Sequence, residues 1–127
     1  MIAIDTSAII AILEAEEDAA HYIAALEEDD APLLSAATFV ELNAVMKHKG
    51  GQAALNIVDR FIELANITIE PFTADQALIA REAYFRFSVL NLGDAYSYAL
   101  AKQKGIPLLF KGKDFFETDI MPYIPSS

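Results

Sequence analysis

Five carboxylates of this chain stand where an α/β fold could bring acidic groups together. Asp5 closes a short apolar run, Glu41 lies among small and apolar residues, and Asp94 opens a helical pattern. Asp114 and Asp119 follow the last apolar run of the chain. Carboxylate oxygens are the ligands that hard divalent cations prefer, and sites for these cations mostly handle phosphate groups. The sequence therefore predicts a cation site assembled from distant segments.

Glu41 is the acid whose surroundings most favour a functional role. The residues one turn before and after it are small or apolar: Ala37, Thr38, Ala44 and Val45. An inward-facing carboxylate without a partner costs several kcal/mol in desolvation, so it should be protonated, paired or bound to a cation. Two structural explanations stay open, because His48 could pair with Glu41 and Thr38 could form a capping box with it.

Each of the other acids also has an ordinary structural explanation. Asp5 could cap the helix that follows it, and Asp94 occupies a first helical turn, where the helix dipole favours a carboxylate in any protein. Asp114 could cap a short turn, and Asp119 could be a loop acid. The combination favours a joint site, because three acids would reach strand ends or helix starts on one side of a sheet.

Other polar side chains near these acids could support such a site. Thr6, Ser7 and Ser97 could place hydroxyl groups around a bound cation or its water molecules. Lys111 and Lys113 follow the last apolar run and are candidates for steering phosphate groups past the net negative charge of the chain.

Alternating strands and helices must position these residues. Strands are predicted at residues 2–5, 33–35, 67–70 and 106–110. Helices are predicted from about residue 8, where Thr6 and Ser7 supply starting hydroxyls, and at residues 36–49, 53–65, 74–85 and 93–103. Such alternation implies an α/β fold with a parallel sheet and helices on its faces.

The length and composition limit the classes of protein. The 127 residues fit one domain, residues 1–127, and the absence of cysteine excludes disulfides, zinc–thiolate sites and thiol catalysis. The N-terminus lacks the basic region of a signal peptide, and no run of about 18 apolar residues predicts a membrane span. We therefore expect a cytoplasmic protein without a membrane partner. Glycine-rich dinucleotide and P-loop motifs are also absent.

The charge is negative and uneven. The net charge of −10 argues against a general electrostatic hold on nucleic acid. Residues 14–30 contain eight acids and no Lys or Arg. This stretch fits a solvated helix face and loop, or a surface for a basic partner protein. The hydrophobic share of 54% fits either a tightly packed core or apolar surface reserved for a partner.

Four segments of the chain form a recognisable set in a fixed order. They are residues 1–8 (MIAIDTSA), 39–42 (FVEL), 90–101 (LNLGDAYSYALA) and 108–115 (LLFKGKDF). Together they resemble PIN-domain proteins, and most of all the VapC-type toxins of bacterial VapBC toxin–antitoxin pairs. The resemblance spans nearly the whole chain.

The resemblance implies a fold, an activity and a set of site residues. The fold would be a three-layer α/β/α sandwich whose central, mostly parallel sheet has about four to five strands. The activity would be that of an Mg²⁺- or Mn²⁺-dependent endoribonuclease, the toxin of a type II toxin–antitoxin pair. Asp5, Glu41, Asp94 and Asp114 match the acidic catalytic and metal-binding positions of the family, and Asp119 is a candidate fifth member.

The resemblance also implies partners. These are a second copy of the chain, a VapB-like antitoxin whose C-terminal segment blocks the site, and an RNA substrate, frequently transfer RNA or ribosomal RNA. Residues 85–89 depart from the family, since relatives commonly carry a longer loop rich in glycine and basic residues there. Two alternatives follow: a catalytically weak PIN-fold domain that binds a partner, and a metal-dependent DNase or phosphatase.

Overall fold

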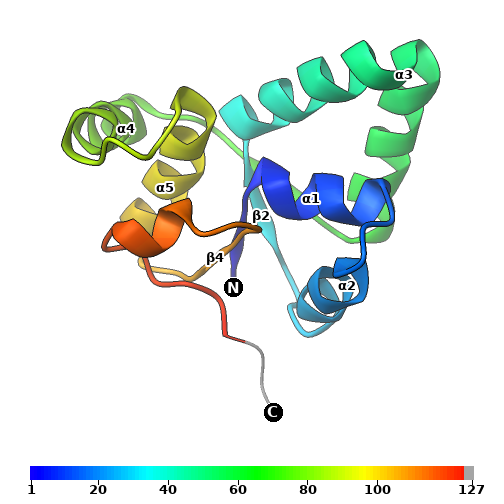
Figure 1. Ribbon diagram of the computed structural model, residues 1–127, viewed down its shortest axis with the longest axis horizontal. Coiled ribbons are helices and arrows are strands. Elements are labelled where there is room, and N and C mark those ends of the chain that lie inside the picture. Colours follow the sequence, from blue (N-terminus) through cyan, green and yellow to red (C-terminus); the bar gives the residue numbers. More distant parts are fainter. Residues whose placement is uncertain (125–127) are drawn as a thin grey trace.

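A four-stranded parallel sheet forms the centre of the molecule (Figure 1), and the structure, a computed structural model, describes residues 1–124. The strands are β1 (Ala3–Ile4), β2 (Leu33–Ser35), β3 (Thr68–Glu70) and β4 (Leu108–Leu109). Their order in the sheet is β3-β2-β1-β4, and every neighbouring pair is parallel. The predicted α/β class and strand number are therefore confirmed.

Helices connect the strands and cover both faces of the sheet. They are α1 (Thr6–Leu13), α2 (Ala19–Glu27), α3 (Ala36–Leu64), α4 (Ala74–Arg86), α5 (Leu92–Lys104) and the short 3₁₀ helix η1 (Asp114–Glu117). In Figure 1, α1, α2 and α3 lie on one side of the sheet and α4 and α5 lie on the other.

The alternation of side chains along each strand explains these layers. Successive residues of a strand point to opposite faces of its sheet. Ile4 and Leu109 pack in a core with side chains of α1, α2 and α3. Ala3 and Leu108, one position earlier on the same strands, pack in a second core with side chains of α4 and α5. Two cores on one sheet give the three-layer sandwich.

The long helix α3 contains the break that the sequence predicted. Residues 36–49 and 53–65 were expected as two helices separated by Gly50 and Gly51. Gly51 has a non-helical backbone, with φ 63° and ψ −149°, and α3 turns a sharp corner there in Figure 1. The prediction of two segments is confirmed, although they form one bent element.

Helix starts at the carboxyl edge of the sheet place functional side chains there. Asp5, directly after β1, caps α1 by accepting a hydrogen bond from the Ser7 backbone N–H. Ser35, at the end of β2, caps α3 in the same way through Ala37. The expectation that Thr6 and Ser7 precede the helix was wrong, because the Asp5 side chain supplies the cap and α1 begins at Thr6.

Two features of the other elements agree with the sequence. Thr73 caps α4, and Gly105 ends α5 in a left-handed conformation, with φ 65°. Within residues 1–124, no helix combines the length and apolar character that a membrane crossing requires.

Candidate active site

Asp5 is held rigidly at the carboxyl end of β1. Its side chain is buried, with 3% of its surface exposed. One carboxylate oxygen, Oδ2, accepts hydrogen bonds from the Ser7 backbone N–H at 3.0 Å and the Ser7 hydroxyl at 2.6 Å. The other, Oδ1, accepts from the Ser97 hydroxyl of α5 at 2.6 Å. Three donors therefore fix the orientation of this carboxylate.

Glu41 reaches the same region from α3. Its Oε1 accepts a hydrogen bond from the Thr6 hydroxyl at 2.5 Å, so α1 orients this side chain as well. Neither structural explanation of Glu41 holds. His48 is exposed, and Glu41 bonds to Thr6 instead. A capping box with Thr38 is also absent, because Ser35 caps α3. Thr38 lies buried beside Ser97, with 3.3 Å between their hydroxyl oxygens.

Gly93 gives the Glu41 carboxylate the space that it occupies. A Cβ atom on Gly93 would lie 1.6 Å from Oε2 of Glu41, a distance at which two atoms cannot coexist. The Glu41 carboxylate thus lies against the backbone of the first turn of α5. The close approach brings Glu41 next to the helix turn that carries Asp94.

Asp94 occupies this first turn within a capping box. The Asn91 side chain accepts from the Asp94 backbone N–H at 2.8 Å, and Asp94 Oδ2 accepts from the Asn91 backbone N–H at 3.1 Å. The structural explanation of Asp94 as a helix-start acid is therefore correct. One carboxylate oxygen, Oδ1, has no part in the capping box.

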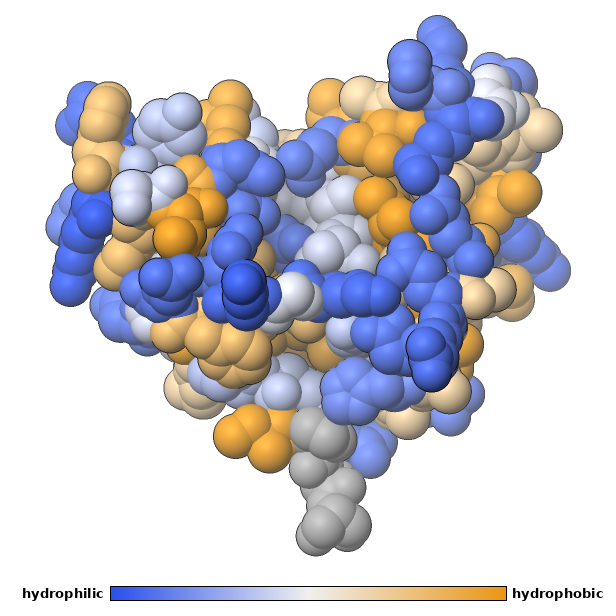
Figure 2. Space-filling view, viewed as in Figure 1, coloured by the Kyte–Doolittle hydropathy of each residue, from blue (hydrophilic) through white to orange (hydrophobic). Residues whose placement is uncertain are grey.

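Asp114 is the fourth acid, and it begins η1 after β4. It is exposed, whereas the next residue, Phe115, is buried in the core and anchors η1. We call Asp5, Glu41, Asp94 and Asp114 the carboxylate cluster. Figure 2 shows the surface hollowed between the α4–α5 side and the α3 side, over the region where α1, α3 and α5 meet in Figure 1.

The four acids act on one another electrostatically. Burial, assisted by the charges of Asp5, Glu41 and Asp114, raises the pKa of Asp94 to about 6, against the opposing effect of the hydrogen bond from Asn91. Burial also raises the pKa of Glu41, opposed by the Thr6 hydrogen bond and assisted by the Asp5 charge. Repulsion and desolvation together disfavour a fully ionised cluster.

The chemistry of the cluster fits a hard divalent cation bound partly through water. Within residues 1–124, no three Asp, Glu or His side chains converge closely enough to hold a metal ion by themselves. Mg²⁺ usually keeps several water molecules and takes one or two carboxylates together with phosphate oxygens of the substrate. The cluster offers carboxylate oxygens, and a bound cation would offset the desolvation and the repulsion that together raise the pKa of Asp94.

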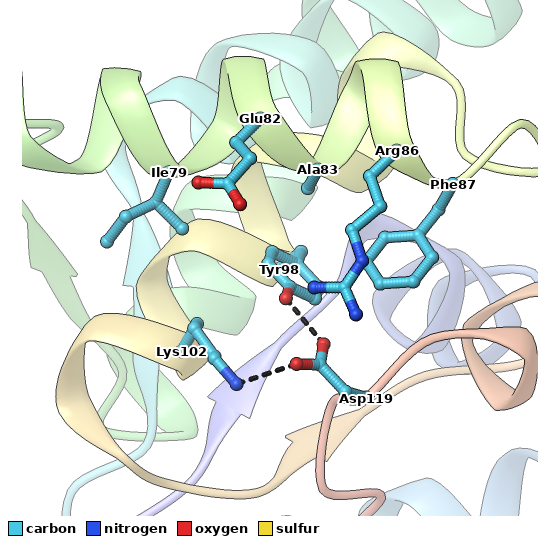
Figure 3. Close-up of a pocket in the computed structure, with 8 residues that line it drawn as sticks. All are labelled: Ile79, Glu82, Ala83, Arg86, Phe87, Tyr98, Lys102 and Asp119. Carbon is cyan, nitrogen blue, oxygen red and sulfur yellow. Dashed lines mark hydrogen bonds and ion pairs between the residues drawn. The ribbon is translucent and has the colours of Figure 1, made fainter.

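Asp119 has a different environment from the cluster. Its Oδ1 accepts a hydrogen bond from the Tyr98 hydroxyl at 2.5 Å, and its Oδ2 pairs with Lys102 Nζ at 2.8 Å (Figure 3). Lys102 lies about two turns along α5 from Asp94. These bonds lower the pKa of Asp119, with the Lys102 interaction contributing most. Asp119 lines a separate pocket of about 140 Å³ between α4 and α5.

The lysines predicted to steer phosphate differ in their surroundings. Lys111 forms ion pairs with Glu16 and with Asp18, the latter at 3.0 Å, so acidic groups already hold its charge. Lys113 is exposed, beside Asp114. Phosphate steering by either residue stays a prediction.

Sequence reasoning missed two contributors to the site. Gly93 could have been noticed, because a glycine inside a helix costs stability and therefore indicates a close approach of other atoms. Asn91 forms a capping box with Asp94, a pattern that the sequence Asn-Leu-Gly-Asp displays. The buried contact between Thr38 and Ser97 joins residues 59 positions apart and had no local signal.

Known proteins resemble this chain in sequence. The family model of the PIN domain matches residues 2–121. Ribonuclease VapC42 of Mycobacterium tuberculosis is 43% identical over 126 residues, which cover 94% of this chain and 96% of that protein. These matches confirm the resemblance found in the four sequence segments.

Solved structures share the fold. VapC20 of Mycobacterium tuberculosis, described as a sarcin-ricin-loop-cleaving toxin, superposes with a TM-score of 0.81 at 21% identity, covering 98% of this chain and 100% of that one. VapBC2 of Rickettsia felis, bound to a DNA fragment from its promoter, gives a TM-score of 0.76 at 15% identity, with coverages of 97% and 98%. Motifs, family model and fold agree, and the chain belongs to the PIN-domain family, in which it is a VapC-type protein.

Proposed function

We propose that this chain is a metal-dependent endoribonuclease and the toxin of a type II toxin–antitoxin pair. The observation that carries the proposal is the carboxylate cluster, which joins four acids from separate segments at the carboxyl edge of a parallel sheet, with the pKa of Asp94 raised to about 6 by burial and by its neighbours' charges. The name of the relative VapC42, a ribonuclease, supports the choice of RNA as substrate.

The mechanism follows from how each acid is held. Asp5, Glu41, Asp94 and Asp114 would hold Mg²⁺ or Mn²⁺, which supplies Lewis-acid stabilisation and an activated water for phosphodiester hydrolysis. Ser7 and Ser97 keep Asp5 in place, and Thr6 directs Glu41 towards Gly93. Because the protein fixes these oxygens before the substrate arrives, little reorganisation is needed during the reaction.

The substrate within this class would be a structured cellular RNA, transfer RNA or ribosomal RNA, and the protein would act in the cytoplasm where these RNAs are found. The structural neighbour VapC20 is described as cleaving the sarcin-ricin loop, which supports a ribosomal target as one option. With a net charge of −10, this chain needs a localised contact with RNA, since a general electrostatic attraction is not available.

An antitoxin would cover an apolar groove between α1, α2 and the second half of α3. The groove has a volume of about 350 Å³ and exposes Ile23 and Leu64, at 40% and 70% of their surface. The acidic side chain of Glu27 also lines the groove. A basic, amphipathic segment of a VapB-like protein fits this combination of charge and apolar surface.

A second copy of the chain would cover a different apolar face, on α4 and α5. Phe85 and Leu92 expose 80% and 57% of their surface there, beside a cavity of about 240 Å³. Burial of such side chains between two protomers would form a homodimer. Light scattering of the purified protein, with Phe85→Ser as the variant, tests this assignment.

Cleavage of total cellular RNA by the purified, antitoxin-free protein tests the activity. We expect discrete fragments with Mg²⁺ or Mn²⁺, none with EDTA, and none with Asp94→Asn. Asp75→Asn is the matched control, because Asp75 is also an acid in the first turn of a helix, but in α4 and outside the cluster. Metal-dependent cleavage by Asp94→Asn at the native rate would overturn the mechanism.

Other outcomes of this experiment would assign the site differently. Preferential cleavage of DNA or of small phosphate esters in competition with RNA would indicate a metal-dependent DNase or phosphatase. No cleavage, together with no calorimetric binding of Mg²⁺ or Mn²⁺, would indicate a PIN-fold domain that only binds a partner.

A further inference from the structure

The loop between β4 and η1, residues 110–113, leads directly to Asp114. Its residue Lys111 reaches across to the loop between α1 and α2, residues 14–18, and forms ion pairs with Glu16 and Asp18. Hydrogen bonds to these two carboxylates raise the pKa of Lys111, and the bond from Lys111 lowers the pKa of Asp18. The side chain therefore ties two loops together that lie 93 to 95 residues apart in the sequence.

The backbone of Lys111 is connected to the cluster through Ser7. Its N–H donates a hydrogen bond to the Ser7 hydroxyl at 3.0 Å, and this hydroxyl donates to Asp5 Oδ2 at 2.6 Å. One residue thus supports Asp5 through Ser7, and it stands three positions before Asp114. A displacement of Lys111 would disturb two members of the carboxylate cluster together.

The chain after Lys111 depends on this attachment. Gly112 has φ 102°, a conformation that side-chain-bearing residues rarely adopt, so the chain bends immediately after the anchored residue. Asp114 is exposed, and no hydrogen bond of its side chain is present within residues 1–124. The backbone at Asp114 lies between the 110–113 loop and buried Phe115.

We propose that Lys111 is a positioning residue of the carboxylate cluster, fixed by Glu16 and Asp18, and not a residue that attracts the phosphate groups of RNA. Its ammonium group holds the 110–113 loop, and through this loop it sets Asp114 and the Ser7 contact to Asp5. The inference rests on the proposed nuclease function for its kinetic readout, but the anchoring can be measured without activity.

The two roles considered for Lys111, positioning and steering, predict opposite effects on RNA cleavage when Glu16 and Asp18 are neutralised. If Lys111 steered phosphate, Glu16 and Asp18 would compete with RNA for its charge, so their neutralisation would improve substrate binding. If Lys111 positions the cluster, the same neutralisation releases the loop and slows catalysis. The double variant Glu16→Gln, Asp18→Asn therefore separates the two roles by the sign of its effect.

The kinetic experiment compares Lys111→Met, the double variant and their combination. A misplacement of catalytic groups by about 1 Å costs up to about 100-fold, so we expect kcat to fall by about 10- to 100-fold in each case, with KM nearly unchanged. The combination should be no slower than either variant alone, because all three remove the same two ion pairs. Lys111→Arg should retain activity by keeping both ion pairs.

Lys104→Met is the matched control. Like Lys111, Lys104 has a side chain that is 38% exposed and pairs with a carboxylate, Glu70, but it lies at the far end of α5 from Asp94. The Lys104→Met variant should change neither kcat nor the protection of the backbone amides of residues 110–115 from hydrogen exchange. Native or faster cleavage by the double variant, or a Lys111→Met defect confined to KM and abolished by salt, would overturn the proposal in favour of steering.

Hydrogen exchange separates a failure of this inference from a failure of the nuclease assignment. In a protein that cleaves no RNA, Lys111→Met should still accelerate exchange of the amides of residues 110–115, including the Lys111 N–H that donates to Ser7. Unchanged exchange in this variant would show that Lys111 does not anchor the loop, whatever the activity of the protein.

Discussion

Asp94 belongs to helix α5 and Asp119 contacts the same helix, yet the surroundings of the two carboxylates shift their pKa values in opposite directions. Asp119 receives hydrogen bonds from Tyr98 and Lys102, and its pKa is lowered. Asp94 is partly buried among three other acids, and its pKa is raised to about 6. The structure thus stabilises the charge of one carboxylate and disfavours that of the other.

The difference indicates which acid serves the fold and which serves function. A carboxylate with a lysine and a tyrosine as partners holds the segment after η1 against α5, a structural role. Uncompensated desolvation and repulsion at Asp94 destabilise the folded chain, and such groups are concentrated at functional sites. A bound cation would remove this penalty, whereas Asp119 has no need of one.

The largest expected effect is on catalysis, in the comparison of Glu41→Gln with Asp119→Asn. Glu41→Gln removes one carboxylate from the cluster and should reduce the rate of RNA cleavage by about 100- to 1,000-fold. Asp119→Asn should leave cleavage within about threefold of the native rate, since Asp119 makes its contacts with Tyr98 and Lys102. Cleavage rates at saturating Mg²⁺ measure both. Equal losses of cleavage rate in the two variants would make Asp119 a fifth functional acid.

A smaller effect on catalysis should come from Gly93→Ala. The added Cβ would lie 1.6 Å from Glu41 Oε2, so the carboxylate must rotate away, which its flexible side chain permits. We expect cleavage to fall by about 10- to 100-fold. Stability should stay the same or rise by up to about 1 kcal/mol, because Ala favours a helix more than Gly does.

Thermal unfolding and cleavage assays of Gly93→Ala check this separation of stability from activity. Gly50→Ala is the control, a helical glycine whose added Cβ would contact Ala54 on α3 and not Glu41. Native activity in Gly93→Ala would mean that the position of the Glu41 carboxylate against α5 is not required.

The comparison also shows what the sequence could predict. Strand–helix alternation, Gly50-Gly51, Thr73 and Gly105 are local signals, and they gave the α/β fold and most element boundaries. The four cluster acids came from motif resemblance and from strand ends. Local patterns could not reveal that Lys111 pairs with Glu16 and Asp18, or that Asp119 bonds to Tyr98 and Lys102, because these contacts form only when distant segments pack.

The smallest expected effects concern stability, and they should have opposite signs for the two acids. The pKa of Asp94 rises from 3.8 to about 6 on folding, so the folded state binds the proton more tightly. The favourable contribution is complete below about pH 4 and is lost as the pH rises through about 6. In full, this shift corresponds to about 3 kcal/mol, but partial exposure of Asp94 to water reduces our expectation to about 1 kcal/mol.

Chemical denaturation between pH 2 and pH 8 measures this contrast. Asp94→Asn keeps an acceptor for the Asn91 N–H but carries no charge, so it should exceed the native protein in stability near pH 8 and match it near pH 4. Asp119 has a lowered pKa, and its stabilising contribution is present above 3.8 and is lost as the pH falls through the lower folded value. Asp119→Asn should therefore be less stable than the native protein near pH 8, with the deficit shrinking in acid. If both variants shifted stability in the same direction, the two carboxylates would not differ in the way that their partners indicate.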